Sequence, residues 1–416
     1  MDYKTKDGYF LETLEKELLN RGIQFERKSD DEIFYGIIEH NLCAEFYEFI
    51  NLVRKFIEIF KQMLIDENRE NYMFDKRINE IRNEEFKYIC YSIDKKQEAE
   101  CRIKALEFLR EIYQYYQKYL IENHMIDYAD MICLCYRQII KEVKNKWPEI
   151  NYKYIVVDEY QDITFQRFLF IKSVVKYFDA KLISVGDDWQ SIYAFTGSRL
   201  EYFNKFKEYF LDAKDDLLIS TTYRYGQELV DITSEFIKRN EEQSRKEIKA
   251  IKNLKEPIEI CEYTKNTECE EINKLVHKLY KENPNANILI LARTNDCLKQ
   301  LGNSEYFTNG IDDILISKEL PNAKIEALTM HRAKGITADQ VIVMGLREKV
   351  FPSKGKIEHW IFEYFSLDYI EDEMPFAEER RLFYVALTRT RNKVYLVVPN
   401  KSISRTNFVN EIEQII

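Results

Sequence analysis

The sequence predicts an α/β protein with parallel sheets, preceded by a helical region. Three observations support this. Short apolar, β-branched runs alternate with amphipathic helical stretches beyond residue 150. Two of these runs end in acidic residues, the place where open α/β sheets bind ligands. Residues 1–120 instead show helical spacing of apolar residues and contain no proline. With 416 residues, 45% of them hydrophobic, the chain can form two or three domains.

The first region, residues 1–120, is predicted to be helical. Apolar residues recur at helical spacing in two stretches. These residues are Phe46, Phe49, Ile50, Val53, Phe56, Ile57 and Phe60, then Leu106, Leu109, Ile112 and Tyr116. The aromatic stripes can be core or a base-stacking surface, and core is the favoured interpretation.

The remainder carries the predicted strands. Residues 154–157 and 182–185 indicate buried parallel strands, because each is short, apolar and followed by acids. Later strands are expected at 287–291, 325–328, 341–344 and 393–398, with helices at 268–280 and 378–387 between them. An acidic stretch around Asp212, Asp215 and Asp216 suggests a domain boundary near residue 215.

Composition gives weaker indications. The net charge of −10 gives no global sign of nucleic-acid binding, although an acidic average can hide a basic groove. The eight cysteines form no CxxC pair, and Cys133 and Cys135 have a spacing unsuited to zinc, so free thiols in the cytoplasm are expected. No stretch is long enough to span a membrane, and we expect no membrane partner.

Asp158 and Glu159, with Asp162 beyond them, are the first candidate chemical site. An acid at the tip of a buried strand can hold Mg²⁺, and a neighbouring carboxylate can activate water. A helix cap or a turn explains such a pair about equally well.

The second candidate runs from Gly186 to Phe195. Gln190 can sense a γ-phosphate, and the flat faces of Tyr193 and Phe195 can stack unpaired bases. The alternative is that the aromatics are core and Asp187 and Asp188 are turn residues.

Three further segments supply basic residues: 220–225, 329–335 and 378–391. Arg224 and Arg389 are candidates for stabilising charge on a transferring phosphoryl group, because the guanidinium presents a planar donor fork. Thr329 and His331, close to Lys334, suit a contact with a phosphate backbone, although a lone histidine is usually structural. The remaining arginines are expected to form surface pairs with nearby acids. These are Arg380, Arg381 and Arg391.

Together the five segments resemble motifs II to VI of the UvrD/Rep helicases of superfamily 1, in the same order. The matching stretches read VDEYQD, VGDDWQSIYAFTG, TTYR, TMHRAKG and EERRLFYVALTRTR. The DDWQ sequence and Phe351-Pro352 are similar to the DNA helicase IV branch, and residues 126–132 resemble the segment before motif II. The resemblance is strong over residues 120–416 and weak before them.

This resemblance implies two RecA-like domains that hold ATP between them, with single-stranded DNA across both and 3′-to-5′ movement. It assigns residues 1–120 to a helical 1B-like subdomain and 121–215 to the C-terminal part of the first RecA-like domain. Residues 216–416 become the second RecA-like domain, without a 2B insertion. The implied roles are Asp158 for Mg²⁺, Glu159 for water, Gln190, Arg224, Gly335 and Arg389 for the nucleotide, and Tyr193, Phe195, Thr329 and His331 for DNA.

Two departures from the family pattern stand out. Motif V reads Gly335-Ile336-Thr337, without the glutamate that the family often has. The phosphate-binding loop GxxxxGK[ST] is absent, since the only Gly-Lys, at 355–356, is followed by Ile357. Three explanations stay open: a fragment of a longer helicase, which is favoured; a short protein whose missing half is a second chain; or a degenerate relative that binds DNA or a partner without hydrolysis. In each case we expect this chain to be inactive alone.

Overall fold

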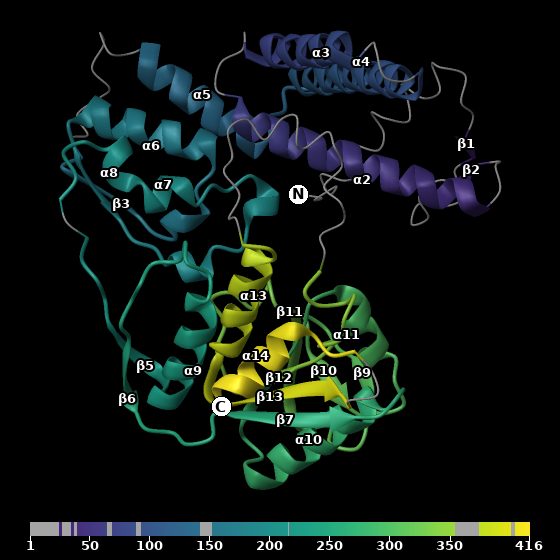
Figure 1. Cartoon of the computed structure of the whole chain (residues 1–416), viewed down its shortest axis with the longest axis vertical. Coiled ribbons are helices and arrows are strands. Elements are labelled where there is room, and N and C mark those ends of the chain that lie inside the picture. The colour runs from purple at the N-terminus through teal and green to yellow at the C-terminus, as the bar shows by residue number, and fades with distance from the viewer. Residues whose placement is uncertain are drawn as a thin grey trace.

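The computed structural model describes residues 25–26, 35–36, 40–64, 69–88, 93–141, 152–214, 216–353, 374–400 and 404–416 (Figure 1). Some of the residues discussed above lie outside these ranges. They are most of the first 39 residues of the predicted helical region, Asp215 at the predicted domain boundary, and the Gly-Lys pair at 355–356. Among the described residues, no helix combines the length and the apolar character needed to cross a bilayer.

The helical region, at the top of Figure 1, consists of α2 (His40–Met63), α3 (Arg69–Tyr88) and α4 (Ile93–Glu122), beside a short pair of antiparallel strands, β1 (Phe25–Glu26) and β2 (Tyr35–Gly36). Apolar side chains of the three helices form one core. Its aromatic members include Phe56, Phe60 and Phe74, with ring centroids of Phe60 and Phe74 4.9 Å apart. The described part of the aromatic stripe is therefore core, as the sequence favoured.

Buried ion pairs connect this helical region to α5 and the residues just before it. Lys61 at the end of α2 lies 2.6 Å from Asp127 and 2.7 Å from Asp130, just before and within α5 (Tyr128–Lys141). The amide of Gln166 in α6 (Phe165–Phe178) donates to the carbonyl of Leu64 at 3.1 Å. A buried lysine needs such partners, because an unpaired charge in the interior is strongly destabilising.

The first sheet contains β3 (Tyr154–Val157) and β4 (Lys181–Ser184), which pair in parallel with α6 as their connection. On one side, Val157 packs towards a small core that includes Phe168 of α6 and Tyr202 of α7 (Glu201–Asn204), and α8 (Phe206–Tyr209) follows. Alternate residues on the strands point away from that core, and Val156 is 65% exposed and Ile183 46% exposed. Both strands occur as predicted, but they are only half-buried.

The second sheet has five parallel strands in the order β11-β8-β12-β13-β7. Their bounds are β7 (Ile258–Tyr263), β8 (Asn287–Ala292), β11 (Lys324–Thr329), β12 (Ala338–Val343) and β13 (Thr390–Pro399). One face packs against α9 (Gln227–Lys238), α13 (Ala377–Leu387) and α14 (Asn407–Ile415), and the other against α10 (Glu268–Glu282) and α11 (Asn295–Gly302). The parallel pair β5 (Thr221–Gly226) and β6 (Lys249–Lys252) and the hairpin β9 (Phe307–Asn309) and β10 (Leu315–Ser317) complete the described strands.

The predicted class, α/β with parallel sheets and an N-terminal helical region, is confirmed. Figure 1 shows the upper end of α13 directed towards the first α/β part.

Candidate functional site

The site begins at the carboxyl end of β3, where Asp158 and Glu159 are both exposed. Glu159 has a left-handed backbone with φ of 51°, and its N–H donates to the Asp158 carboxylate at 2.9 Å. This tight turn places two carboxylates side by side at the strand tip. Neighbouring Gln161 is fully buried, and its amide nitrogen donates to the carboxylate of Glu159.

Gly186, at the end of β4, allows the two strand tips to approach. A Cβ there would lie 2.5 Å from the Gln161 side-chain oxygen and 2.8 Å from the Phe203 ring, so only glycine fits. The Gln161 oxygen instead accepts the N–H of Asp187 at 3.0 Å. The acids after the two strands are therefore joined through one buried amide.

The path continues into the second α/β part. The Gln190 amide donates to Asp187, and its oxygen accepts from Nη2 of Arg389 at 3.3 Å. A continuous set of hydrogen bonds thus runs from Glu159 through Gln161, Asp187 and Gln190 to Arg389. The structure brings together three of the residues that the sequence singled out separately, Glu159, Gln190 and Arg389.

Arg389 is 1% exposed at the end of α13, and its Nε donates to the Val385 carbonyl at 2.9 Å. Burial and the nearby Arg224 lower the pKa of Arg389 to about 10, so it stays charged at neutral pH. Arg224 comes from β5 and donates to the Thr388 carbonyl at 3.2 Å. The two arginines predicted to act on phosphate therefore converge just beyond the end of α13, where Arg389 also contacts Gln190.

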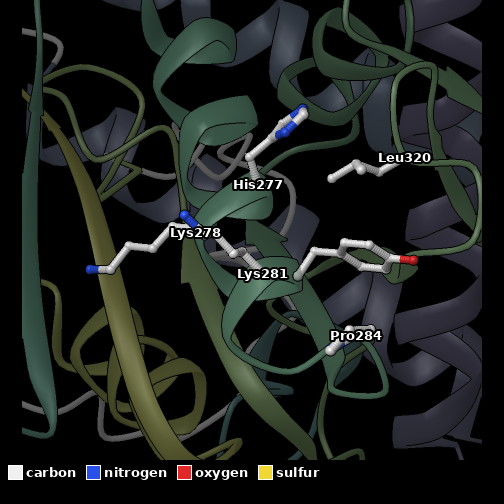
Figure 2. Close-up of a pocket in the computed structure, with 6 residues that line it drawn as sticks. His277, Lys278, Lys281, Pro284 and Leu320 are labelled. Carbon is white, nitrogen blue, oxygen red and sulfur yellow. The ribbon is translucent and has the colours of Figure 1, made fainter.

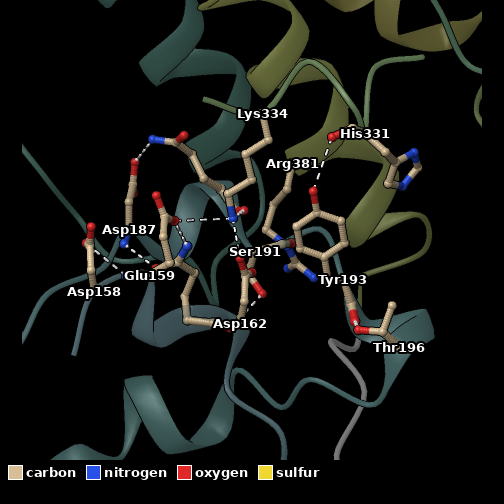
Figure 3. Close-up of polar contacts among 12 residues, drawn as sticks. Asp158, Glu159, Asp162, Asp187, Ser191, Tyr193, Thr196, His331, Lys334 and Arg381 are labelled. Carbon is tan, nitrogen blue, oxygen red and sulfur yellow. Dashed lines mark hydrogen bonds and ion pairs between the residues drawn. The ribbon is translucent and has the colours of Figure 1, made fainter. Parts of the chain in front are cut away.

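Lys334, which follows β11 in the second α/β part, reaches the acidic residues at the end of the first sheet (Figure 3). Its ammonium pairs with Asp162, lies 3.4 Å from Glu159 and donates to the Gln190 carbonyl at 2.9 Å. Burial raises the pKa of Asp162, while Lys334 opposes the rise. Sequence reasoning used Lys334 only as a neighbour of His331, because the sequence does not show that it reaches across to the acids.

The segment from Asp188 to Ala194 is packed into the second α/β part. Trp189 and Ile192 are fully buried, with Ile192 in the core beneath the second sheet. Arg381 of α13 donates from Nε to the Ser191 carbonyl at 2.6 Å, and Glu378 accepts the Ala194 N–H at 2.9 Å. This segment fixes the two α/β parts relative to each other.

The expectation that all three flanking arginines form surface pairs is therefore wrong for two of them. Arg381 is 2% exposed and bonds a backbone carbonyl, and Arg380 is 3% exposed and holds Glu411 with two hydrogen bonds. Arg391 is exposed, 3.4 Å from Asp339, as expected.

A group of rings lies at the other end of the same segment. The Tyr193 hydroxyl donates to the His331 carbonyl at 3.2 Å (Figure 3). The rings of Phe195 and His331 meet edge to face, with their centroids 5.3 Å apart. Phe195 is 40% exposed. Burial and the charge of Arg293 lower the pKa of His331 to about 4, so its ring is neutral at pH 7.

The remaining two predicted residues are placed differently. Thr329 is 9% exposed, and its hydroxyl accepts the Arg332 N–H at 3.4 Å, so it caps a turn instead of facing solvent. Gly335 is exposed with φ of +86°, a conformation that favours glycine, and a Cβ there would meet nothing within 4 Å.

The acids at the end of β3 can supply some, but not all, of the ligands of a metal ion. Mg²⁺ in nucleotide sites binds one or two carboxylates together with phosphate oxygens and water, and the exposed Asp158 can supply the carboxylate. Among the described residues, no cluster of three or more His, Cys, Asp or Glu forms a metal site of its own. The six cysteines described are free thiols. A surface pocket lined by His277, Lys278 and Leu320 contains none of the predicted site residues (Figure 2).

Comparison with known families identifies the family of the chain. Residues 7–211 match the UvrD/REP helicase N-terminal domain, and residues 308–401 match the UvrD-like helicase C-terminal domain. The chain belongs to the UvrD-like helicases of superfamily 1. The recognition of this family from the five motifs is confirmed.

Three relatives show how much of such a protein is present. DNA helicase IV of Escherichia coli K12 is 29% identical over 296 residues, 70% of this chain and 40% of that protein. A probable DNA helicase of Mycoplasma pneumoniae is 27% identical over 391 residues, 91% of this chain and 66% of that protein. PcrA of Staphylococcus aureus Mu50 is 25% identical over 57% of this chain and 32% of its own length. This UvrD-like chain therefore spans less than two thirds of each.

Among solved structures, the C-terminal domain of a possible DNA helicase from Lactobacillus plantarum covers 46% of this chain and 94% of its own. It shares 15% identity at a TM-score of 0.30, which is too low to establish a common fold.

Sequence reasoning missed Gln161 and Asp187 as members of the site. The only signal for Gln161 is a polar residue between two residues of a conspicuous acidic motif. Asp187 was noted as a turn residue, which it is, but its carboxylate also holds the Gln190 amide.

Proposed function

We propose that this chain is a portion of a cytoplasmic motor that moves 3′-to-5′ along single-stranded DNA by hydrolysing ATP. The observation that carries the proposal is the hydrogen-bonded path from Glu159 to Arg389. It links the acid end of the first sheet to an arginine of the second α/β part. Such a link couples nucleotide chemistry to the relative position of two domains.

In this proposal Asp158 and Glu159 act at the strand tip. Asp158 would hold Mg²⁺, which neutralises charge on the phosphates when bound. Glu159 would accept a proton from the attacking water, and its exposed carboxylate is accessible to such a water. Arg224 and Arg389 would stabilise charge that develops on the transferred phosphoryl group, with Gln190 between the acids and Arg389.

Single-stranded DNA would pass over the rings beside this path. Tyr193 and Phe195 would stack bases, with His331 next to them and neutral. Thr329 would act there only by shaping the turn, since its side chain is buried. The same proposal divides the chain into three parts. Residues 1–120 form the helical subdomain, and residues 121–215 form the C-terminal part of the first motor domain. Residues 216–416 form the second motor domain, without an insertion.

The chain should not turn over ATP alone. In such motors, backbone N–H groups and a lysine of the phosphate-binding loop supply most of the affinity for the β- and γ-phosphates. The sequence of 416 residues contains no GxxxxGK[ST] pattern. This favours a second candidate function for the chain in isolation, an ATPase-deficient module that binds DNA or serves as a scaffold.

A hydrolysis assay separates the two candidates. Residues 1–416 should show no DNA-stimulated ATPase, and a polypeptide that carries the phosphate-binding loop, in cis or as a second chain, should restore it. In the restored motor, Glu159→Gln should stop hydrolysis and leave ATP binding intact, because only the proton acceptor is removed. Hydrolysis by residues 1–416 alone, lost in Glu159→Gln, would show that another loop holds the phosphates. Failure of every added segment would favour the scaffold.

A further inference from the structure

The segment 240–248 follows α9 in the second α/β part. It contacts the stretch of the first α/β part that resembles motif III. Asp188 is fully buried, and its two carboxylate oxygens accept the Ser244 N–H at 2.8 Å and the Ser244 hydroxyl at 2.7 Å. Lys246 forms ion pairs with both Asp187 and Asp188. Two adjacent carboxylates of the first α/β part are thus bound by one short segment of the second.

Trp189, between Gln190 and these acids, is held by the same segment. Its indole N–H donates to the Ser244 carbonyl at 3.0 Å, and the Lys246 ammonium lies 5.1 Å from the centre of its ring. The indole is fully buried and packs against Ile237 and Tyr384. These contacts hold Trp189 on one side of Asp187, whose own side chain is only partly buried.

Lys246 and Gln190 meet at Asp187. One carboxylate oxygen of Asp187 pairs with Lys246 and also accepts the Trp189 N–H, and the other accepts the Gln190 amide. The Gln190 oxygen is thereby turned towards Arg389. Burial lowers the pKa of Lys246, but Asp187 and Asp188 outweigh it and the net shift is upward, so the ammonium is charged.

We propose that Lys246 is a positioning residue for ATP hydrolysis, which holds Asp187 so that the Gln190 amide faces Arg389. It touches none of the reacting groups. Without the ammonium, two adjacent carboxylates would repel each other and the Gln190 amide would lose its fixed acceptor. The inference rests on the proposed motor function, because it concerns the rate of the same reaction.

The test compares variants in the motor with its phosphate-binding loop restored. Lys246→Met keeps the length of the side chain and removes the charge. It should lower kcat about tenfold while the KM for ATP and the affinity for single-stranded DNA change less than about twofold, since the lost interaction acts on the chemical step. Lys246→Arg should recover most of the rate. Lys238→Met is the matched control, because the Lys238 ammonium also lies over the Trp189 ring, at 5.7 Å, while its described contacts include neither Asp187 nor Asp188. It should keep the wild-type rate.

A double-mutant cycle tests the route of the effect. If Lys246 acts through Gln190, then Lys246→Met should change kcat less than about twofold in a Gln190→Ala background. Independent, multiplying effects would overturn the proposal. So would a Lys246→Met variant with wild-type kcat, or one in which kcat and DNA affinity fall while the KM for ATP rises.

A second readout needs no hydrolysis and keeps the two proposals separable. In residues 1–416 with ¹⁵N-labelled glutamine, the Gln190 side-chain amide should exchange slowly with solvent in wild type and at least about tenfold faster in Lys246→Met, because a lost hydrogen bond exposes it. Unchanged exchange would overturn the role of Lys246, whatever the motor assay shows. Should Lys246→Met not fold, Lys246→Gln, which removes the charge and keeps a polar group at this position, takes its place in both measurements. An absence of hydrolysis in the restored wild type, with the exchange effect present, would instead count against the motor function alone.

Discussion

The two parallel sheets both contain short strands rich in apolar residues, but the strands have different surroundings. In the second sheet, residues 288–292 of β8 are all buried, because helices cover both faces. In the first sheet, β3 and β4 alternate between exposed and half-buried residues, and Tyr154, Val156 and Ile183 face solvent. An apolar β-branched run thus indicates a strand suited to burial on two faces. Whether both faces are buried depends on helices that other parts of a chain supply.

The difference in burial between the two sheets affects how the residues of the candidate site are kept in position. The acids sit at the tips of the exposed sheet, but Gln161 is fully buried and motif III is fixed by the second α/β part. The exposed apolar residues of β3 and β4 therefore matter little to the position of Gln190. They form a surface patch that, in soluble proteins, commonly marks an interaction site.

The largest expected effect comes from equal truncations in the two sheets. Ile290→Ala removes a fully buried side chain and should lower the free energy of unfolding by about 2–5 kcal/mol. Ile183→Ala, at a 46% exposed position, should lower it by less than about 1 kcal/mol, since little surface returns to water. Urea unfolding followed by circular dichroism measures both. Similar losses at the two positions would mean that the first sheet is as well covered as the second.

A second comparison separates aromatic residues used for packing from those available to DNA. Changing Tyr193 and Phe195 to Ala should weaken binding to single-stranded DNA by about 1–3 kcal/mol per lost stack. Fluorescence anisotropy with a labelled oligonucleotide measures this, and binding should fall steeply with salt because backbone contacts release counterions. Tyr154→Ala, an exposed aromatic on β3, is the control and should bind as wild type. Equal binding by the double variant and wild type would remove the stacking assignment.

The sequence was sufficient where a function depends on neighbours in the chain. Asp158 and Glu159 lie at a strand tip because strands end where their apolar run ends. The convergence of Gln190 with Arg389 came from the family resemblance, and the hydrogen bond between them was found only in the structure. No local pattern could show that Lys246 reaches Asp187, 59 residues away in the sequence, or that Lys334 reaches Asp162.

Buried charge was the main source of error. Arg380 and Arg381 were assigned to the surface because charged side chains are rarely buried without partners. Their partners, Glu411 and the Ser191 carbonyl, come from distant elements, so the compensation is invisible in the local sequence. Thr329 was placed beside DNA for a different reason, its position at a strand end in a motif that resembles motif V, and in the structure its hydroxyl closes a turn.

The smallest expected effect concerns pH and the boundary between the two α/β parts. The pKa of His331 is lowered to about 4 by burial and by Arg293, against about 6.5 in an unfolded chain. Between these values the unfolded state binds a proton that the folded state does not, so stability should rise with pH from about 4 to 6.5 and be complete above that. Because the ring is partly exposed, its contribution should be on the order of 1 kcal/mol.

His331→Gln isolates this contribution, since glutamine keeps polar atoms near the rings and cannot take up the proton. Above pH 7 the variant measures the loss of packing against Phe195, and the difference from wild type should shrink as the pH falls towards 4. Unfolding free energies measured at intervals of half a pH unit give both quantities. A difference that stays constant with pH would show that the proton is bound equally in the folded and unfolded states. His331 would then ionise with the ordinary pKa of a solvated ring, and the rings of motifs III and V would not exclude water from it.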